Sequence, residues 1–105
     1  VDTMQITYAA RNSDFDGYDI HEGDYLAMHG SALFGTSKDI KVLLRALAEK
    51  TRDDGKEFIT IYYGEDIQEK HAQKAADLFA EVCPDADVNL INGGQPVYYY
   101  LISAE

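Results

Sequence analysis

The sequence predicts an α/β fold of the α+β type: a two-layer sandwich in which two main helices cover one face of a mixed sheet of about six strands. The chain has 105 residues, 46% of them apolar and 27% charged, which suits one globular domain with its own core. Two segments carry the periodicity of amphipathic helices, and the other apolar segments have the length and composition of strands. Since two helices cannot cover both faces of such a sheet, we expect one face to stay open.

The first third of the chain is predicted to alternate strands with polar turns. Residues 4–10 alternate apolar and polar side chains, as a half-buried strand does. A polar loop over 11–17 ends in an Asp-Gly turn signal, and 18–20 form a short extended piece. Residues 25–29 are the second main strand, and 32–35 return as a short third strand.

The first helix is predicted to begin at Thr36 or Ser37, because either residue is a good N-cap. It ends before the polar loop of residues 53–56. Its apolar positions have the i, i+3, i+4, i+7 spacing of a helix that packs on a sheet. These positions are Ile40, Leu43, Leu44 and Leu47.

The centre of the sheet and the second helix follow. Residues 58–63 are apolar at nearly every position, which is typical of a strand in mid-sheet. Asp66 and Glu69 have the spacing of a capping box at the start of the second helix, and Pro84 ends it. The predicted buried stripe of this helix comprises Ile67, His71, Ala75, Leu78, Phe79 and Val82.

A glycine turn joins the last two predicted strands, residues 88–91 and 97–102. Asn-Gly between two strands is a strong hairpin signal, and we favour that interpretation. The alternative is an anion site, because consecutive glycines can offer backbone N–H groups to a carboxylate or phosphate. The candidate ligand contacts in this turn are Asn92, Gly93, Gly94 and Gln95.

The closing strand carries three consecutive tyrosines. Alternation places Tyr99 on one face, with Val97 and Leu101, and Tyr98 and Tyr100 on the other. Because the row of Tyr99 is the more apolar, we expect it to lie under the helices. Tyr98 and Tyr100 would then lie on the open face, where exposed aromatic side chains commonly meet a partner, and they are candidate partner contacts.

Charge narrows the choice of partners. The net charge is −10, which disfavours nucleic acid and anionic lipid but allows a basic protein partner. No apolar run reaches the length of a membrane span, so membrane insertion is not expected. The single cysteine, Cys83, cannot form an internal disulfide, which fits a reducing compartment. The chain begins at Val1 without a start methionine, and we expect residues 1–105 to be a single domain excised from a longer protein.

One segment imitates a calcium loop. Asn12, Asp14, Asp16 and Gly17 match the start of an EF-hand loop. The bidentate acid is due at position 23, which is Gly23, and the flanking residues have the pattern of strands. We therefore favour a loop and turn without a metal.

No catalytic set is predicted. His29 lies near Ser31, but the Gly-x-Ser-x-Gly elbow of a serine nucleophile is missing. Cys83 comes at the end of a predicted helix, where the helix dipole disfavours a thiolate. The turn before the second helix carries Glu65 and Asp66, whose charges oppose a bound phosphate. We expect no catalytic, cofactor-binding or metal-binding residue in this domain.

Several segments carry a family resemblance. They are Thr7-Tyr8-Ala9-Ala10-Arg11, Asp16-Gly17, Ile20-x-Glu22-Gly23-Asp24-Tyr25, Thr60-Ile61-Tyr62-Tyr63-Gly64-Glu65-Asp66, Asn92-Gly93-Gly94-Gln95-Pro96-Val97-Tyr98 and Ile102-Ser103-Ala104-Glu105. In this order they resemble the C-terminal domain of the YloV-type, dihydroxyacetone-kinase-like proteins, a family that includes the large subunit of bacterial fatty acid kinase (FakA). Arg11, in the first segment, joins the candidate partner or ligand contacts.

The resemblance implies a multidomain, cytoplasmic bacterial kinase as the parent protein. ATP and magnesium would be held by an N-terminal domain, and no residue that binds them can be placed on this chain. A separate DegV-like protein would carry the fatty acid whose carboxylate receives the phosphoryl group, and the C-terminal domain would hold that partner. The fold is similar to the second domain of DegV-like proteins.

Two functions from different classes follow. The first is a non-catalytic interaction domain that contacts a DegV-like partner and the other domains of its own chain. The second is a module that binds a small ligand, an anion or a fatty acid, at the turn of residues 92–95. An exposed aromatic sheet face favours the first, and a closed cavity beside Gly93 and Gly94 favours the second.

Overall fold

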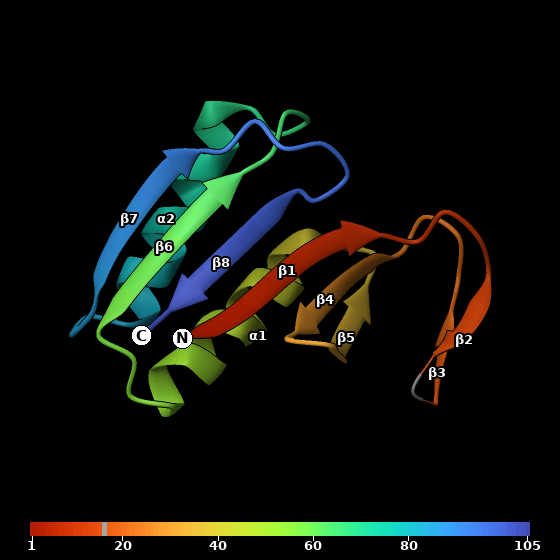
Figure 1. Ribbon diagram of the computed structural model, residues 1–105, viewed down its shortest axis with the longest axis horizontal. Coiled ribbons are helices and arrows are strands. Elements are labelled where there is room, and N and C mark those ends of the chain that lie inside the picture. The colour runs from red at the N-terminus through yellow and green to blue at the C-terminus, as the bar shows by residue number, and fades with distance from the viewer. Residues whose placement is uncertain (16) are drawn as a thin grey trace.

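The computed structural model describes residues 1–15 and 17–105, and it confirms the two-layer α+β architecture (Figure 1). The elements in chain order are β1 (Asp2–Tyr8), β2 (Ser13–Phe15), β3 (Tyr18–Ile20), β4 (Tyr25–His29), β5 (Ala32–Ser37), α1 (Ile40–Asp53), β6 (Phe58–Tyr63), α2 (Glu69–Val82), β7 (Asp87–Asn92) and β8 (Tyr100–Ala104). Both helices lie behind the main sheet in the view of Figure 1, so the face toward the reader is the uncovered one. Within the described ranges, neither helix is long and apolar enough to cross a membrane.

The main sheet is mixed and has six strands in the order β5-β4-β1-β8-β6-β7. β6 and β7 are parallel, and the other pairings in this sheet are antiparallel. α2 supplies the crossover between the two parallel strands, which cannot be joined by a tight turn. The C-terminal strand β8 enters between β1 and β6, so segments from both ends of the chain meet in the middle of the sheet.

The core lies between the sheet and the helices. Ile102 of β8 pairs with Met4 on one side and with Ile61 on the other, so three apolar side chains form one row beneath the helices. Neighbouring rows and the inner faces of α1 and α2 complete the core. The largest fully buried side chains are Phe79, Met4, Ile6, Leu47, Ile59, Ile61 and Ile102.

The last strand begins later than predicted, and the predicted assignment of its faces is wrong. β8 starts at Tyr100, after an irregular segment over 97–99. Tyr100 pairs with Ile6 and Tyr63, which both face the helices, and only 2% of its surface is exposed. The alternation was counted through the irregular segment, whereas the neighbouring strands set the true phase, because a buried row must continue across every strand it crosses. Tyr100 therefore lies in the core, and Leu101 faces away from the helices.

α1 also begins later than predicted. Thr36 and Ser37 belong to β5, and the N-cap is Asp39, whose carboxylate accepts the backbone N–H of Lys41 at 2.9 Å. An acidic side chain at this position satisfies one of the unpaired N–H groups of the first turn. The predicted stripe is confirmed by the burial of Leu43, Leu44 and Leu47.

α2 begins at Glu69, with Gln68 as its N-cap, and no side-chain hydrogen bond caps it. The predicted capping box of Asp66 and Glu69 is therefore wrong. His71 is exposed rather than part of the buried stripe. Small residues set the phase of the helix instead, because they let its backbone approach the sheet closely. The buried residues of α2 are Ala72, Ala75, Ala76, Phe79 and Val82.

The hairpin of β2 and β3 closes one end of the uncovered face. Ile20 of β3 is buried with Ala9 and Leu33, and Leu26 and Met28 pack against this second small cluster. The hairpin thus covers the part of the face formed by β4 and β5. β1, β8, β6 and β7 stay uncovered.

The segment that imitates a calcium loop lies at this hairpin. Its flanks are strands, as predicted, and the side-chain oxygen of Asn12 accepts the backbone N–H of Glu22 at 2.7 Å. Asp16, the last acid of the motif, lies outside the described residues. Elsewhere in the chain, as far as it is described, no three His, Cys, Asp or Glu side chains gather as a metal site requires.

Candidate functional site

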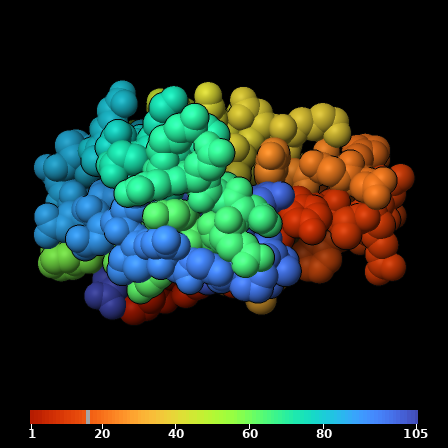
Figure 2. All heavy atoms as spheres, turned by 90° about the horizontal axis from the view of Figure 1, so that it is seen from above, coloured from red at the N-terminus to blue at the C-terminus, as the bar shows by residue number. Residues whose placement is uncertain are grey.

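The glycine-rich segment over 92–96 crosses the end of β6. β7 and β8 are not neighbours, since β6 lies between them, so the predicted hairpin is wrong. In Figure 2 the connection from β7 to β8 (blue) lies against the chain that leaves β6 (green). The connection therefore joins the ends of three strands.

Hydrogen bonds fasten this connection to the chain that leaves β6. The backbone N–H of Gly64 donates to the carbonyl oxygen of Tyr99 at 2.9 Å, and that of Glu65 donates to the carbonyl oxygen of Gln95 at 3.0 Å. The side-chain amide of Gln95 donates to the carbonyl oxygen of Tyr62 at 3.1 Å. These bonds satisfy backbone groups at the end of the sheet that no strand pairing reaches.

Gly64 has no room for a side chain. A Cβ atom at this position would overlap the carbonyl oxygen of Tyr98 and lie 2.8 Å from that of Gln95. Only glycine lets two backbone segments approach this closely. The Tyr-Gly-Glu-Asp and Asn-Gly-Gly-Gln-Pro segments, distant in sequence, are thus complementary in shape.

The glycine amides of the connection are already engaged. The backbone N–H groups of Gly93 and Gly94 both donate to the carbonyl oxygen of Tyr63, at 3.0 and 3.1 Å. An anion would have to displace these bonds. Residues 92–95 line neither the larger hollow between the two helices nor the smaller hollow beside Cys83. The geometry therefore does not support an anion site in this turn.

The other candidate contacts are dispersed. Tyr98 lies on the connection and is 38% exposed, and its carbonyl oxygen accepts from the side chain of Gln95. Tyr100 is buried, so its predicted role as a surface contact is wrong. Arg11 is exposed in the link from β1 to β2, on the side of the molecule that carries the hairpin (Figure 1). The structure brings Tyr98 to residues 92–95 and separates Tyr100 and Arg11 from them.

The centre of the uncovered sheet face is free of charged side chains. One row across β1, β8, β6 and β7, given by the strand register, consists of Gln5, Leu101, Tyr62 and Ile91. The next row consists of Thr3, Ser103, Thr60 and Asn89. We call these two rows the open-face patch. It is uncharged in a chain in which 27% of residues are charged, and it is one place where a partner can bind.

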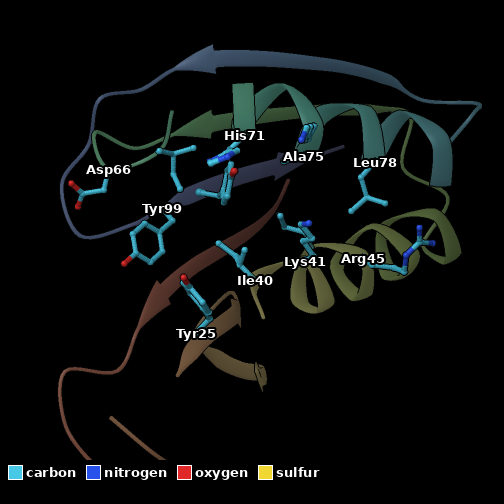
Figure 3. A pocket seen from close by; sticks show the side chains of 13 residues that line it. Tyr25, Ile40, Lys41, Arg45, Asp66, His71, Ala75, Leu78 and Tyr99 are labelled. Carbon is cyan, nitrogen blue, oxygen red and sulfur yellow. The ribbon is translucent and has the colours of Figure 1, made fainter. Parts of the chain in front are cut away.

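The second feature is a groove between the two helices, with a volume of about 700 Å³. The helices touch at one end, where the Cys83 thiol donates to the carbonyl oxygen of Ala48 at 3.3 Å. They separate toward their N-termini, where side chains of both helices and the sheet edge line the opening (Figure 3). The apolar lining includes Ile40, Leu44, Ile67, Leu78 and Tyr100. We call this feature the interhelical groove.

The charges around the interhelical groove oppose the charge of the whole chain. Lys41 and Arg45 of α1 and Lys74 of α2 line it, against one carboxylate, that of Asp66. In Figure 3, Asp66 lies at one end, beside Tyr25 and Tyr99, whereas Arg45 lies toward the other. A groove with an apolar floor and cationic sides suits an amphipathic anion.

The tyrosines at the base of the groove are kept neutral by burial. Burial raises the pKa of Tyr100 to about 12. Burial is also the largest cause that raises the pKa of Tyr99, and Tyr25 and Tyr8 add to it. The rings of Tyr99 and Tyr25 pack at a centroid distance of 5.6 Å. Both phenols therefore remain hydrogen-bond donors at neutral pH.

The groove could not be identified from the sequence. Lys41 and Arg45 are four residues apart, directly beside the apolar stripe of the first helix, and Lys74 has the same relation to the second stripe. This arrangement is ordinary on a surface helix, because lysine and arginine stems commonly flank an apolar stripe. Only the separation of the two helices turns these residues into the walls of one groove.

Cys83 is buried and chemically quiet. Burial raises the pKa of its thiol, and the Arg52 charge offsets only part of this effect. A thiol with a raised pKa is a poor nucleophile at neutral pH. The structure thus agrees with the sequence-based expectation that Cys83 is unreactive.

Comparison with known proteins identifies the family. The model of the C-terminal domain of FakA-like fatty acid kinases matches residues 1–105. Protein YloV of Bacillus subtilis (strain 168) is 31% identical over 105 residues, which are all of this chain and 19% of that protein. An uncharacterized protein of Staphylococcus haemolyticus is 30% identical, and one of Staphylococcus aureus (strain MRSA252) is 26% identical, with the same coverage. The chain thus spans about a fifth of the curated relatives it matches, and it belongs to the family of FakA-like fatty acid kinase C-terminal domains.

Proposed function

We propose that this chain is a non-catalytic interaction domain of a cytoplasmic, bacterial fatty-acid-kinase-like protein. It docks a DegV-like fatty-acid-binding partner, so that an ATP- and magnesium-binding domain elsewhere in the parent can phosphorylate the acyl carboxylate. The observation that carries the proposal is the open-face patch. Family membership supports the kinase parent, and the resemblance of the sequence suggests the partner.

The chemistry of the patch suits a protein interface. Interface centres are depleted of charged residues and enriched in tyrosine, and Tyr62 stands in the middle of the patch between Leu101 and Ile91. Threonine, serine and amide side chains around it supply hydrogen bonds without the desolvation cost of a charge. The patch lies on four strands of the rigid sheet, so it loses little conformational entropy when a partner binds.

The test is direct binding of the chain to the DegV-like protein of the same organism, measured by calorimetry. Leu101→Glu places a charge at the centre of the patch. It should weaken binding about a hundredfold, the effect of losing an interface hot spot. Val42→Glu is the matched control, because Val42 is an exposed apolar residue on α1, on the other side of the sheet. It should leave binding unchanged.

The folded state of each variant is checked by its melting temperature. Equal binding by Leu101→Glu and the unmodified chain would show that the partner docks elsewhere. A complete lack of binding between the unmodified chain and the DegV-like protein would remove that partner from the proposal. Loss of binding by Val42→Glu alone would move the docking site to the helical face.

A further inference from the structure

We propose that the interhelical groove is a binding site for a single-chain amphipathic anion, a molecule with one alkyl chain and a carboxylate or phosphate head. This inference is independent of the docking role, because the interhelical groove and the open-face patch lie on opposite faces of the sheet.

The unpaired cations are the first argument. Lys38, Lys50, Arg52 and Lys56 each form an ion pair with a described carboxylate. By contrast, the three cations that line the groove form no ion pair with any described carboxylate: Lys41, Arg45 and Lys74. In a chain with a net charge of −10, acidic partners are plentiful, and three unpaired cations around one groove form a local site for an anion.

The apolar floor is the second argument. Leu44 and Tyr100 are buried at 4% and 2% exposure, and Ile40, Ile67 and Leu78 are half-buried around them. A free inorganic anion would gain nothing from these side chains, whereas an alkyl chain gains about 0.8 kcal/mol for each buried CH₂ group. The combination of floor and walls therefore selects an amphiphile over a simple ion.

The shape of the groove is the third argument. The volume of about 700 Å³ falls in the usual range of small-molecule sites, about 300–1,000 Å³. The contact between Cys83 and Ala48 closes one end, which favours a small molecule over a protein segment that would need to pass through.

The position of Asp66 orients the ligand. Its carboxylate lies beside Tyr25 and Tyr99, away from Arg45 (Figure 3). Like charges repel, so the anionic head belongs near Lys41, Arg45 and Lys74, and the chain end lies toward the two tyrosines.

The experiment titrates the 105-residue chain with dodecanoate below its micelle concentration, by calorimetry and by backbone amide NMR. Dodecanol has the same chain without the charge, acetate has the same head without the chain, and dodecyl phosphate exchanges the head. Dodecanoate and dodecyl phosphate should bind one to one, at least about tenfold tighter than dodecanol and far tighter than acetate. Amide shifts should concentrate on residues 40–45 and 67–78.

Variants locate the site. Lys41→Gln with Arg45→Gln should weaken dodecanoate binding at least about tenfold and leave dodecanol binding unchanged. Lys74→Gln should weaken it less, and Lys70→Gln, an exposed lysine of α2 outside the groove, should not change it. Val42→Asn is the control for altered helix surface.

Several outcomes would overturn the proposal. They are the absence of saturable binding, dodecanoate binding that the double variant leaves intact, equal binding of dodecanol, and shifts spread over the open-face patch. None of these would affect the docking proposal, which is tested at Leu101.

Discussion

Tyr100 shows how one residue serves the sheet and the helices together. It begins β8, pairs with Ile6 and Tyr63, and lines the base of the interhelical groove. Burial raises its pKa to about 12, so the phenol is neutral in the folded protein well above the pH at which a free tyrosine ionises.

Tyr100 should make the protein sensitive to alkali. The unfolded chain loses the Tyr100 proton near pH 10 and the folded protein near pH 12, so the folded state binds the proton more tightly. Stability is therefore full below about pH 10 and falls as the pH rises to about 12, by up to about 3 kcal/mol. Urea unfolding across this pH range measures the fall. Tyr100→Phe should flatten it in part, because the pKa of Tyr99 is also raised. Tyr98→Phe, at an exposed position, should retain it.

Gly64 should tolerate no side chain. Gly64→Ala forces a Cβ atom against the carbonyl oxygens of Tyr98 and Gln95, which belong to backbone and cannot rotate away. We expect a loss of more than about 2 kcal/mol in the free energy of unfolding, measured with urea. Gly94→Ala is the comparison, because Gly94 has a φ of 65° but its Cβ would meet open space. It should cost about 1 kcal/mol, from backbone strain alone. Equal costs for both would contradict the steric explanation.

At the scale of elements, the connection from β7 to β8 differs from the regular strands around it. It crosses the end of β6, and it contains Val97, a β-branched residue with a φ of 70°. The hydroxyl of Thr7 donates to the carbonyl oxygen of Val97 at 3.2 Å, which helps to hold this conformation. A left-handed valine costs about 1–2 kcal/mol, so the contacts of the connection must offset that cost.

Val97→Asn should therefore stabilise the protein by up to about 1 kcal/mol, because asparagine adopts a positive φ more readily than valine. Val97 is 56% exposed, so little apolar burial is lost. Val42→Asn is a matched control, since Val42 is also 56% exposed but lies in α1. The two residue types have similar helix propensities, so this change should alter stability by no more than about 0.5 kcal/mol. Melting temperatures decide the matter, and a destabilised Val97→Asn would show that the valine side chain makes a necessary contact.

At the scale of the whole molecule, charge is unevenly distributed. The centre of the uncovered sheet face has no charged side chain, and the interhelical groove gathers three cations in a strongly acidic chain. The two sites lie on opposite sides of one sheet. A protein partner on the open face and a small ligand between the helices could therefore bind at the same time.

The open-face patch can be tested by chemical labelling. Ser103→Cys puts a thiol at the centre of the patch with almost no change in shape, and the native Cys83 adds little background because it is buried. The new thiol should react readily with a maleimide in the isolated chain and far more slowly in the complex with the DegV-like protein. Val42→Cys, on α1, should react at the same rate in both. Equal rates for Ser103→Cys with and without bound partner would exclude this face as the interface.

Local patterns predicted the elements well and their connections poorly. The stripe of Leu43, Leu44 and Leu47 and the strand over 58–63 were recognisable, because helix and strand periodicity depend only on neighbouring residues. The hairpin expected after Asn92 was wrong, because an Asn-Gly signal cannot reveal that β6 lies between the two strands it joins. The site followed the same rule: the cations beside the helical stripes were visible, but the groove between them was not.

The sequence alone determined the α+β class, two amphipathic helices, one uncovered sheet face and the family, since each rests on local periodicity, on composition or on motifs read in order. Only the tertiary structure decided which tyrosine is buried, where β8 enters the sheet, and that Gly64 faces the backbone of the β7–β8 connection. The physical reason is that these features depend on pairing between residues far apart in the chain. The face of Tyr100 follows from Ile6 and Tyr63 beside it, and not from its own neighbours in sequence.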